Sequence, residues 1–265
     1  IEIPTLPTGT GQPGALSAGH PVEEFVPGLA DDETVVALAA LDGGDASGVA
    51  LGTASGVVKR VQPDYPANRD EFELITLKEG DRVIGAAYLA GDTVSLESVD
   101  LVFITSDAQL LRFAAASVRP QGRQAAGMAG IRLSAGASAI WFGAIGPAVS
   151  GSVPPAGPSG EAAGEPVVVT VAGRSGALPG TGGASVKVTP FAEYPQKGRA
   201  TGGVRCQRFL KGEDGLTQAW IGPPPVIGAT ESGVVVDLTD MRGRRDGSGN
   251  AVTRHLAHLG HPFRA

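Results

Sequence analysis

Short runs of apolar residues, each followed by a turn residue and a second apolar run, recur along the chain. The clearest copies lie at 49–60, 101–112, 167–173 and 226–236. β-Branched and aliphatic residues dominate these runs, with Gly, Ala or Asp at the turn, a pattern typical of β-hairpins. Each copy carries a threonine after its first run, at Thr53, Thr105, Thr170 and Thr230. The spacings of 52, 65 and 60 residues indicate a radial β-repeat such as a propeller.

A second feature follows each hairpin: a loop that contains an aromatic residue or arginine, a proline or glycine, and an arginine. Its instances are 65–69, 119–123 and 194–199, and another pair of short strands follows each of them. One hairpin and one such pair give about four strands per unit. The sequence therefore predicts an all-β fold, a propeller-like ring of about four to five four-stranded blades.

The spacing also divides the chain into the units of a single domain, 1–265. We expect complete blades at 48–99, 100–163 and 164–224. Residues 1–47 and 225–241 are each long enough for part of a blade only, and together they are expected to close the ring. Gly, Pro, Ala and Ser dominate 146–165, which we interpret as a flexible insertion, and the Gly-rich basic segment 242–265 as a flexible tail.

Composition agrees with many short strands joined by tight turns, because the chain holds 40 Gly and 20 Pro. No apolar run approaches the roughly 18 residues that span a bilayer, and residues 1–19 lack the pattern of a signal peptide. The single cysteine, Cys206, alternates with apolar residues and is expected to be a small core residue. These features favour a cytoplasmic location.

Charge is distributed unevenly along the chain, whose net charge is −6. Residues 1–118 carry 6 basic and 18 acidic side chains, whereas residues 119–265 carry 15 basic and 9 acidic ones. The window 185–211 contains six basic residues and one acidic residue, Glu193. An asymmetry of this size indicates a surface for a polyanion on an otherwise acidic protein. Ordinary surface solvation is the competing interpretation.

The hairpins of the form apolar-apolar-apolar-Thr-x-x-Gly-x-x-Arg, alternating with Gly/Arg loops, resemble a known family. They are similar to the C-terminal β-pinwheel of bacterial type IIA topoisomerase A subunits, most specifically at 100–112, 120–133 and 194–210. Gyrase in this family carries a basic box of the kind Gln-Arg-Arg-Gly-Gly-Lys-Gly, which 121–127 and 196–203 match only in part. This departure favours a topoisomerase IV A subunit, with gyrase as the alternative. High Ala and Gly usage fits an actinobacterial source.

The resemblance implies a non-catalytic domain that bends duplex DNA and presents it to an ATP-dependent strand-passage core. The partners that it implies are double-stranded DNA, an ATPase B subunit, and the remainder of the A subunit in an A2B2 assembly, at the nucleoid and not at a membrane. No cofactor is expected in this domain, since ATP and Mg²⁺ belong to the holoenzyme. The family's cleavage tyrosine lies upstream, so Tyr65, Tyr88 and Tyr194 are not nucleophile candidates.

Basic residues beside glycine can approach phosphates closely, and each neutralised phosphate releases counterions. A structural alternative is that these charges only discourage pairing of strand edges. The candidates for contact with the DNA backbone are Lys59, Arg60, Arg112, Arg119, Arg123, Arg132, Lys187, Lys197, Arg199, Arg205, Arg208 and Lys211.

Other motifs favour structural interpretations. The segment 9–14 matches a dinucleotide fingerprint in spelling but has a proline where a helix would begin. His255, His258 and His261 lack a carboxylate or cysteine beside them and do not predict a metal site. Equivalent placement of the two tryptophans predicts packing between blades, at Trp141 and Trp220. A propeller enzyme, a sugar-binding propeller and a protein-interaction propeller remain as alternatives from other classes.

Overall fold

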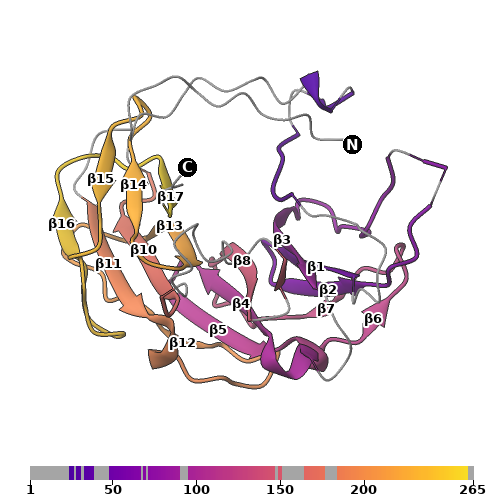
Figure 1. The fold of residues 1–265 in the computed structure, drawn as a ribbon. Helices are drawn as coiled ribbons and strands as arrows, with labels where there is room; N and C mark the ends of the chain where they lie inside the picture. Colours follow the sequence, from indigo (N-terminus) through magenta and orange to yellow (C-terminus); the bar gives the residue numbers. More distant parts are fainter. Residues whose placement is uncertain are drawn as a thin grey trace.

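The computed structural model describes residues 24–26, 28–30, 33–38, 48–66, 68–69, 71–89, 95–146, 149–150, 164–176 and 184–261. These residues form strands and short 3₁₀ helices, and the strands belong to four sheets that follow one another around an arc (Figure 1). Within these ranges, no helix is both long and apolar enough to cross a membrane. The expected partial blade 1–47 and insertion 146–165 lie largely outside the described residues.

Each sheet is built on a central hairpin whose inner neighbour is a strand from later in the chain. Sheet 1 has the order β6-β2-β1-β3-β9 with β7 also on β2, sheet 2 is β12-β5-β4-β8, sheet 3 is β13-β10-β11-β16, and sheet 4 is β15-β14-β17. The strand bounds in sheet 1 are β1 (Gly48–Thr53), β2 (Val57–Val61), β3 (Val83–Leu89), β6 (Pro120–Gln121), β7 (Met128–Ala129) and β9 (Val149–Ser150). Those in sheet 2 are β4 (Asp100–Thr105), β5 (Gln109–Ala114), β8 (Ala139–Ile145) and β12 (Val204–Arg205).

Sheets 3 and 4 complete the described arc. Sheet 3 contains β10 (Val167–Gly173), β11 (Ala184–Pro190), β13 (Gly215–Gly222) and β16 (Asn250–Val252). Sheet 4 contains β14 (Ile227–Ala229), β15 (Val235–Asp237) and β17 (His258–Gly260). The 3₁₀ helices are η2 (Ser95–Ser98), η3 (Ala115–Ser117) and η4 (Phe191–Glu193), and η3 and η4 follow the hairpins of sheets 2 and 3.

Threonine hydroxyls stabilise three of the hairpin turns. The Oγ1 atoms of Thr53, Thr105 and Thr230 each accept a hydrogen bond from the backbone N–H four residues later, at 3.2, 3.0 and 3.0 Å. Thr170 does not share this role, because it lies inside β10 and pairs with Lys187. The prediction that Thr170 is equivalent to the other three was therefore wrong by three residues. The strand β10 continues past that threonine, through Val171 and Ala172, to Gly173.

The outer edge of each of sheets 1 to 3 is completed by a segment from the next unit of the chain. β7 pairs with β2, β12 with β5, and β16 with β11, all antiparallel. The predicted blades 48–99, 100–163 and 164–224 instead each kept all their strands in one continuous segment. The structure corrects this assignment. Strands of two or three residues pair through their backbones and leave no hydrophobic period in the sequence.

The prediction for 242–265 is also corrected, because this segment was expected to be a flexible tail. Its described part, up to His261, contributes β16 to sheet 3 and β17 to sheet 4. The imidazole Nδ1 of His261 lies 3.2 and 3.1 Å from the carbonyl oxygens of Pro223 and Pro225. Among the described residues, no group of His, Cys, Asp or Glu is arranged to hold a metal ion. Glycine-rich composition concealed these strands, because backbone pairing does not require apolar side chains.

Both faces of the middle sheets are buried, which explains the continuous apolar runs. Along β4, Leu101 and Phe103 pack into a core with sheet 1, whereas Val102 and Ile104 pack into a core with sheet 3. The Phe103 ring lies 4.8 Å from that of Phe142 on β8, measured between centroids. β3 packs against β8, β8 against β13, and β13 against β17, so the inner strands connect the sheets in chain order.

Three side chains confirm their predicted structural roles in these cores. Trp141 packs against the core between sheets 2 and 3, and Trp220 against the core between sheets 3 and 4. Cys206 is fully buried in the first of these. Burial raises the pKa of its thiol to about 12, so the group is a neutral packing residue near pH 7.

We expect the Gly85→Ala variant to be less stable than the wild type by about 2–3 kcal/mol. A Cβ atom at Gly85 would lie 2.3 Å from the backbone oxygen of Phe142, so sheets 1 and 2 would have to separate. Gly260→Ala is the matched control, since that strand glycine has nothing within 4 Å of the added atom. Urea denaturation measures both midpoints. Equal midpoints for the two variants would contradict the close approach of the sheets.

Candidate nucleic-acid interface

Three Gly/Arg loops lie at equivalent places along the outer edges of sheets 1, 2 and 3. We call them rim loop 1 (120–128), rim loop 2 (196–204) and rim loop 3 (242–250). Each begins at a parallel bridge to the outer hairpin strand, and the three bridges are Arg60↔Pro120, Arg112↔Gln196 and Val188↔Arg242. Each ends at an antiparallel pair with the same strand, at Val58↔Met128, Leu110↔Val204 and Val186↔Asn250. The three loops are therefore structural repeats of equal length.

A buried lysine supports rim loop 1 from beneath. The side chain of Lys59 is inaccessible to solvent, and its Nζ donates to the carbonyl oxygens of Leu74, Arg123 and Ala125 at 2.7, 2.6 and 2.7 Å. Three acceptors match the three N–H donors of an ammonium group. Burial lowers the pKa of Lys59, and the carbonyl oxygens offset part of that cost of burying charge.

Rim loop 3 has the same arrangement around Lys187. This side chain is also inaccessible, and its Nζ donates to the carbonyl oxygens of Arg244, Arg245 and Gly247 at 3.0, 2.5 and 3.1 Å. Burial lowers the pKa of Lys187 to about 8. The two lysines occupy the same position in their sheets, one residue before the bridged residues Arg60 and Val188.

Rim loop 2 is held differently. The residue at the equivalent position is Leu111, which is buried in the core between sheets 1 and 2. The loop closes on itself instead, because Lys197 Nζ donates to the Gly203 carbonyl at 3.2 Å and Thr201 Oγ1 donates to the Gly198 carbonyl at 2.9 Å.

The fourth residue of each rim loop is an arginine, and its side chain contacts a residue from an earlier unit of the chain. In rim loop 2, Arg199 Nη1 donates to the Ala129 carbonyl, and in rim loop 3, Arg245 Nη1 donates to the Arg205 carbonyl at 3.1 Å. In rim loop 1, the Arg123 guanidinium lies over the Phe72 ring, 5.7 Å from its centroid. These contacts join the loops into one continuous outer rim.

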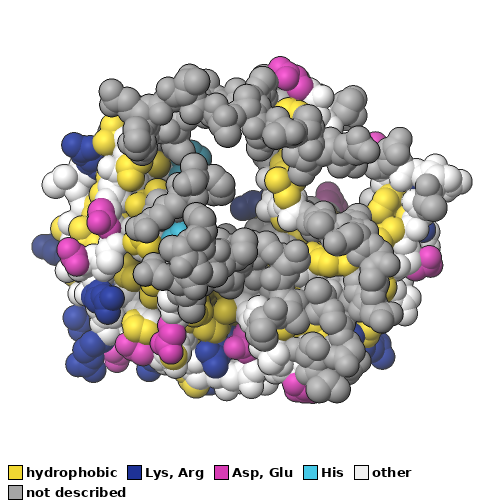
Figure 2. All heavy atoms as spheres, viewed as in Figure 1, with side chains coloured by type: hydrophobic (Ala, Val, Ile, Leu, Met, Phe, Trp, Pro, Cys, Tyr) yellow, Lys and Arg dark blue, Asp and Glu magenta, His cyan; other side chains and the backbone are white. Residues whose placement is uncertain are grey.

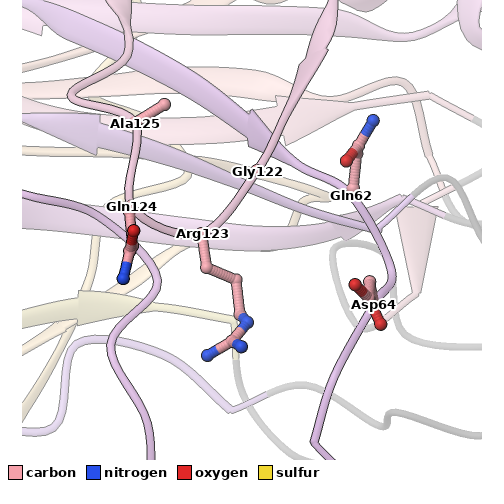
Figure 3. Close-up of a pocket in the computed structure, with 6 residues that line it drawn as sticks. All are labelled: Gln62, Asp64, Gly122, Arg123, Gln124 and Ala125. Atoms are coloured by element: carbon pink, nitrogen blue, oxygen red, sulfur yellow. The ribbon is translucent and has the colours of Figure 1, made fainter.

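A shallow hollow of about 410 Å³ lies beside rim loop 1. Figure 3 shows the Arg123 side chain between Gln124, on the same loop, and Asp64, on the segment after β2. Gln62, Gly122 and Ala125 complete the lining. The hollow is polar and open, and it presents one guanidinium and two side-chain amides, while the Asp64 carboxylate opposes the approach of a phosphate.

Six predicted cations are exposed in the structure, and two on the rim loops are half-buried. The half-buried ones are Arg123 and Arg199. The exposed ones are Arg119, Arg132, Lys197, Arg205, Arg208 and Lys211. Arg132 and Arg208 are equivalent, because their backbone N–H groups donate to Thr201 and Gly247 at the same position of rim loops 2 and 3. Lys211 lies apart from the rim loops, in the turn Leu210–Glu213 before β13.

Four predicted DNA contacts are corrected by their burial or by their internal partners. Lys59, Arg60 and Lys187 are buried and cannot reach a phosphate outside the domain. Arg112 Nε lies 3.4 Å from Asp100 Oδ2, and its guanidinium stacks on Phe191 at 4.7 Å. The error has a physical reason, because the two lysines point beneath the loops that cover their strands, whereas Arg112 is held by Asp100 and Phe191. The sequence has no periodic pattern that shows which strands these loops cover.

Three arginines of rim loop 3 were not among the predicted DNA contacts. Arg242 and Arg244 are exposed, the latter with 89% of its side chain accessible, and Arg245 is half-buried. Their signal was present as three arginines in four residues beside Gly243, a third copy of the Gly/Arg loop. The prediction of a flexible tail at 242–265 concealed this third copy.

The charge asymmetry along the chain is also an asymmetry in space. Lys and Arg side chains gather along the lower left edge in Figure 2, where Figure 1 places β11, β16 and β12. The segments beside sheet 1 instead expose carboxylates at Asp64, Glu71, Glu73 and Glu79. The basic arc therefore covers the edges of sheets 2 and 3 most densely and weakens toward sheet 1.

Comparison with solved structures places this arrangement in a fold class. The C-terminal domain of DNA topoisomerase IV superposes with a TM-score of 0.67 at 19% identity, covering 91% of this chain and 70% of that one. A DNA gyrase A C-terminal domain gives a TM-score of 0.61 at 14% identity, covering 89% and 73%. The domain is thus an all-β structure of the β-pinwheel class, as the sequence predicted.

Sequence comparison shows a similarity to the same group of domains. The family described as DNA gyrase C-terminal domain, beta-propeller, matches residues 100–143 and 180–219. The topoisomerase subunit TopoM of Mycolicibacterium smegmatis is 34% identical over 125 residues, 47% of this chain and 14% of that protein. The DNA gyrase A protein of Deinococcus deserti is 28% identical over 195 residues, 72% of this chain and 21% of that protein.

The predicted resemblance to the C-terminal β-pinwheels of type IIA topoisomerase A subunits is therefore confirmed, both in fold and in sequence. The chain spans about a tenth to a fifth of the length of the curated relatives it matches.

We expect Lys187→Met to lower the free energy of unfolding by about 2–3 kcal/mol, because three buried carbonyl groups lose their donor. Lys59→Met should have a similar effect for the same reason. Lys211→Met, at an exposed turn position, is the control and should change stability by less than about 0.5 kcal/mol. Urea denaturation monitored by tryptophan fluorescence measures all three. Wild-type stability in both buried variants would show that the ammonium groups are dispensable.

Proposed function

We propose that this domain binds the backbone of duplex DNA along its outer rim and bends the duplex. The observation that carries the proposal is the repetition of a basic loop of the same length at the outer edges of three successive sheets. The domain would present DNA to the ATP-dependent strand-passage core as the non-catalytic C-terminal domain of a topoisomerase IV A subunit. Its partners in this role would be an ATPase B subunit, together with the remainder of the A subunit, in the cytoplasm.

The physics of the rim supports bending. Exposed guanidinium and ammonium groups repeat around an arc, so a duplex that follows them must curve to reach successive loops. Smooth bending of 20–30 base pairs costs about 1–6 kcal/mol. Several phosphate contacts, each of which releases counterions, can offset this cost. The described residues include no helix that could enter a major groove, so affinity should depend weakly on base sequence.

The direction of the path follows from the charges. Rim loops 2 and 3 and the segments that follow them expose at least five cations, whereas the exposed cations beside sheet 1 share that region with Asp64, Glu71 and Glu73, which would repel phosphates. We therefore expect the bound duplex to be held most firmly at rim loops 2 and 3 and more weakly at rim loop 1. A path that covers only part of the rim would bend DNA without a complete wrap.

The choice between topoisomerase IV and gyrase rests on two observations that point in opposite directions. The degenerate boxes in rim loops 1 and 2 favour topoisomerase IV. The names of several relatives, which are gyrase A subunits, favour the alternative, a wrapping domain for negative supercoiling. Relaxing a closed plasmid with a nicking and sealing enzyme in the presence of this domain separates them. Trapped supercoils of one sign would support the gyrase assignment, and none would support topoisomerase IV.

Fluorescence anisotropy of a 40-base-pair duplex, titrated across a salt series, tests the binding proposal. We expect affinity that falls steeply with salt, with a slope equivalent to several phosphates and about −0.9 per contact. The triple variant Lys197→Glu, Arg205→Glu and Arg208→Glu should weaken binding and reduce that slope by about three units. Its matched control reverses three exposed cations beside sheet 1: Arg69→Glu, Lys78→Glu and Arg82→Glu.

The control variant changes the net charge equally and should retain most of the affinity. An equal loss of affinity in both variants would mean that net charge alone determines binding. That result would contradict the rim as the DNA-binding surface. No binding by the wild-type chain even at low salt would leave a protein-interaction propeller as the leading function.

A further inference from the structure

The buried lysines touch the rim loops that carry the proposed DNA contacts, although they cannot touch DNA themselves. We propose that Lys187 and Lys59 are positioning residues that hold rim loops 3 and 1 in their DNA-binding conformations. This inference rests on the proposed function and deepens it. It assigns to the two lysines a role in affinity that acts through the arginines above them.

The hydrogen bonds fix the orientation of the loop backbone. In rim loop 3, three carbonyls in the four residues from Arg244 to Gly247 point inward to one Nζ atom, at 2.5 to 3.1 Å. With the carbonyls turned inward, the Arg244 side chain is 89% accessible on the outside. Arg245 meanwhile reaches the Arg205 carbonyl at 3.1 Å. One ammonium therefore determines which way the arginine-bearing backbone faces.

Close packing of glycines onto the lysine stems strengthens the assignment. A Cβ atom at Gly243 would lie 2.8 Å from both Cγ and Cδ of Lys187, and one at Gly127 would lie 3.3 Å from Cβ of Lys59. The loops thus lie directly on the lysine side chains, and the absence of a Cβ atom permits this approach. A rim loop that is ordered before binding avoids most of the entropy cost of ordering when DNA arrives.

Rim loop 2 provides an internal comparison. Its sheet position holds Leu111 in place of lysine, and its closure comes from Lys197 and Thr201 inside the loop. A lysine on the outer hairpin strand is therefore unnecessary for a loop that is closed by hydrogen bonds between its own residues. Rim loops 1 and 3 receive the equivalent support from below.

A double-mutant cycle on the full 265-residue chain tests the proposal. Lys187→Met should weaken binding of the 40-base-pair duplex and reduce the salt slope by about two, through loss of the contacts of Arg242 and Arg244. In the Arg242→Gln/Arg244→Gln background, the same substitution should have no further effect on affinity. Leu111→Met is the matched control, and its affinity should stay within twofold of the wild type.

Two results would overturn the proposal. Additive losses from Lys187→Met and the arginine variant would mean that the lysine acts independently of the loop. A Lys187→Met domain that is folded by circular dichroism and binds like the wild type would mean that it does not act at all. Lys187→Gln, whose amide retains two donors, replaces the methionine variant if the latter does not fold. The corresponding cycle of Lys59→Met with Arg123→Gln tests rim loop 1 separately.

Hydrogen exchange without DNA separates this proposal from the proposed function. Lys187→Met should speed amide exchange in 242–250 and leave 196–204 unchanged, whether or not the chain binds DNA. Unchanged exchange in 242–250 would refute the positioning role even if the wild type binds DNA tightly. Faster exchange in a chain that does not bind DNA would retain the loop support and refute the DNA function.

Discussion

The rest of the architecture depends on backbone pairing between the outer hairpin strand of each of sheets 1 to 3 and a short segment from the next unit. β7, β12 and β16 make these pairs in sheets 1, 2 and 3, and a nine-residue rim loop leads into each pair. A sheet edge that would otherwise expose unpaired N–H and C=O groups is thereby covered. The same pairing fixes where each Gly/Arg loop lies, because the loop is anchored at both ends on one strand.

This constraint explains why the cations fall into two classes. Residues of the outer hairpin strand lie beneath the loop, and a lysine there finds its acceptors among the loop's own carbonyls, as at Lys59 and Lys187. Residues of the loop and of the segment after it lie above, and their guanidinium groups are exposed or reach the neighbouring segment. The exposed cations and the buried lysines that support the loops therefore come from neighbouring segments of the same sheet.

The rim is continuous because successive loops touch, and its charge is graded because successive units differ. Arg199 and Arg245 donate to the carbonyls of Ala129 and Arg205, which directly follow rim loops 1 and 2. Displacement of one loop is therefore opposed by the next. Toward sheet 1, exposed carboxylates accompany the exposed arginines and offset their charge. A polyanion on this surface would meet a rigid arc with strong and weak ends, which distinguishes it from a uniformly basic ring.

Sequence periodicity by itself determined the all-β class and the recurring hairpins. Runs such as Leu101 to Ile104 are apolar at every position because both faces of the sheet are buried. The sequence also determined that basic charge concentrates after residue 118. The tertiary structure alone decided which unit completes each sheet, and that Lys187 lies inside while Arg244 lies outside. The physical reason is that pairing of two-residue strands is a backbone interaction that any side chain permits, so it leaves no pattern in the sequence.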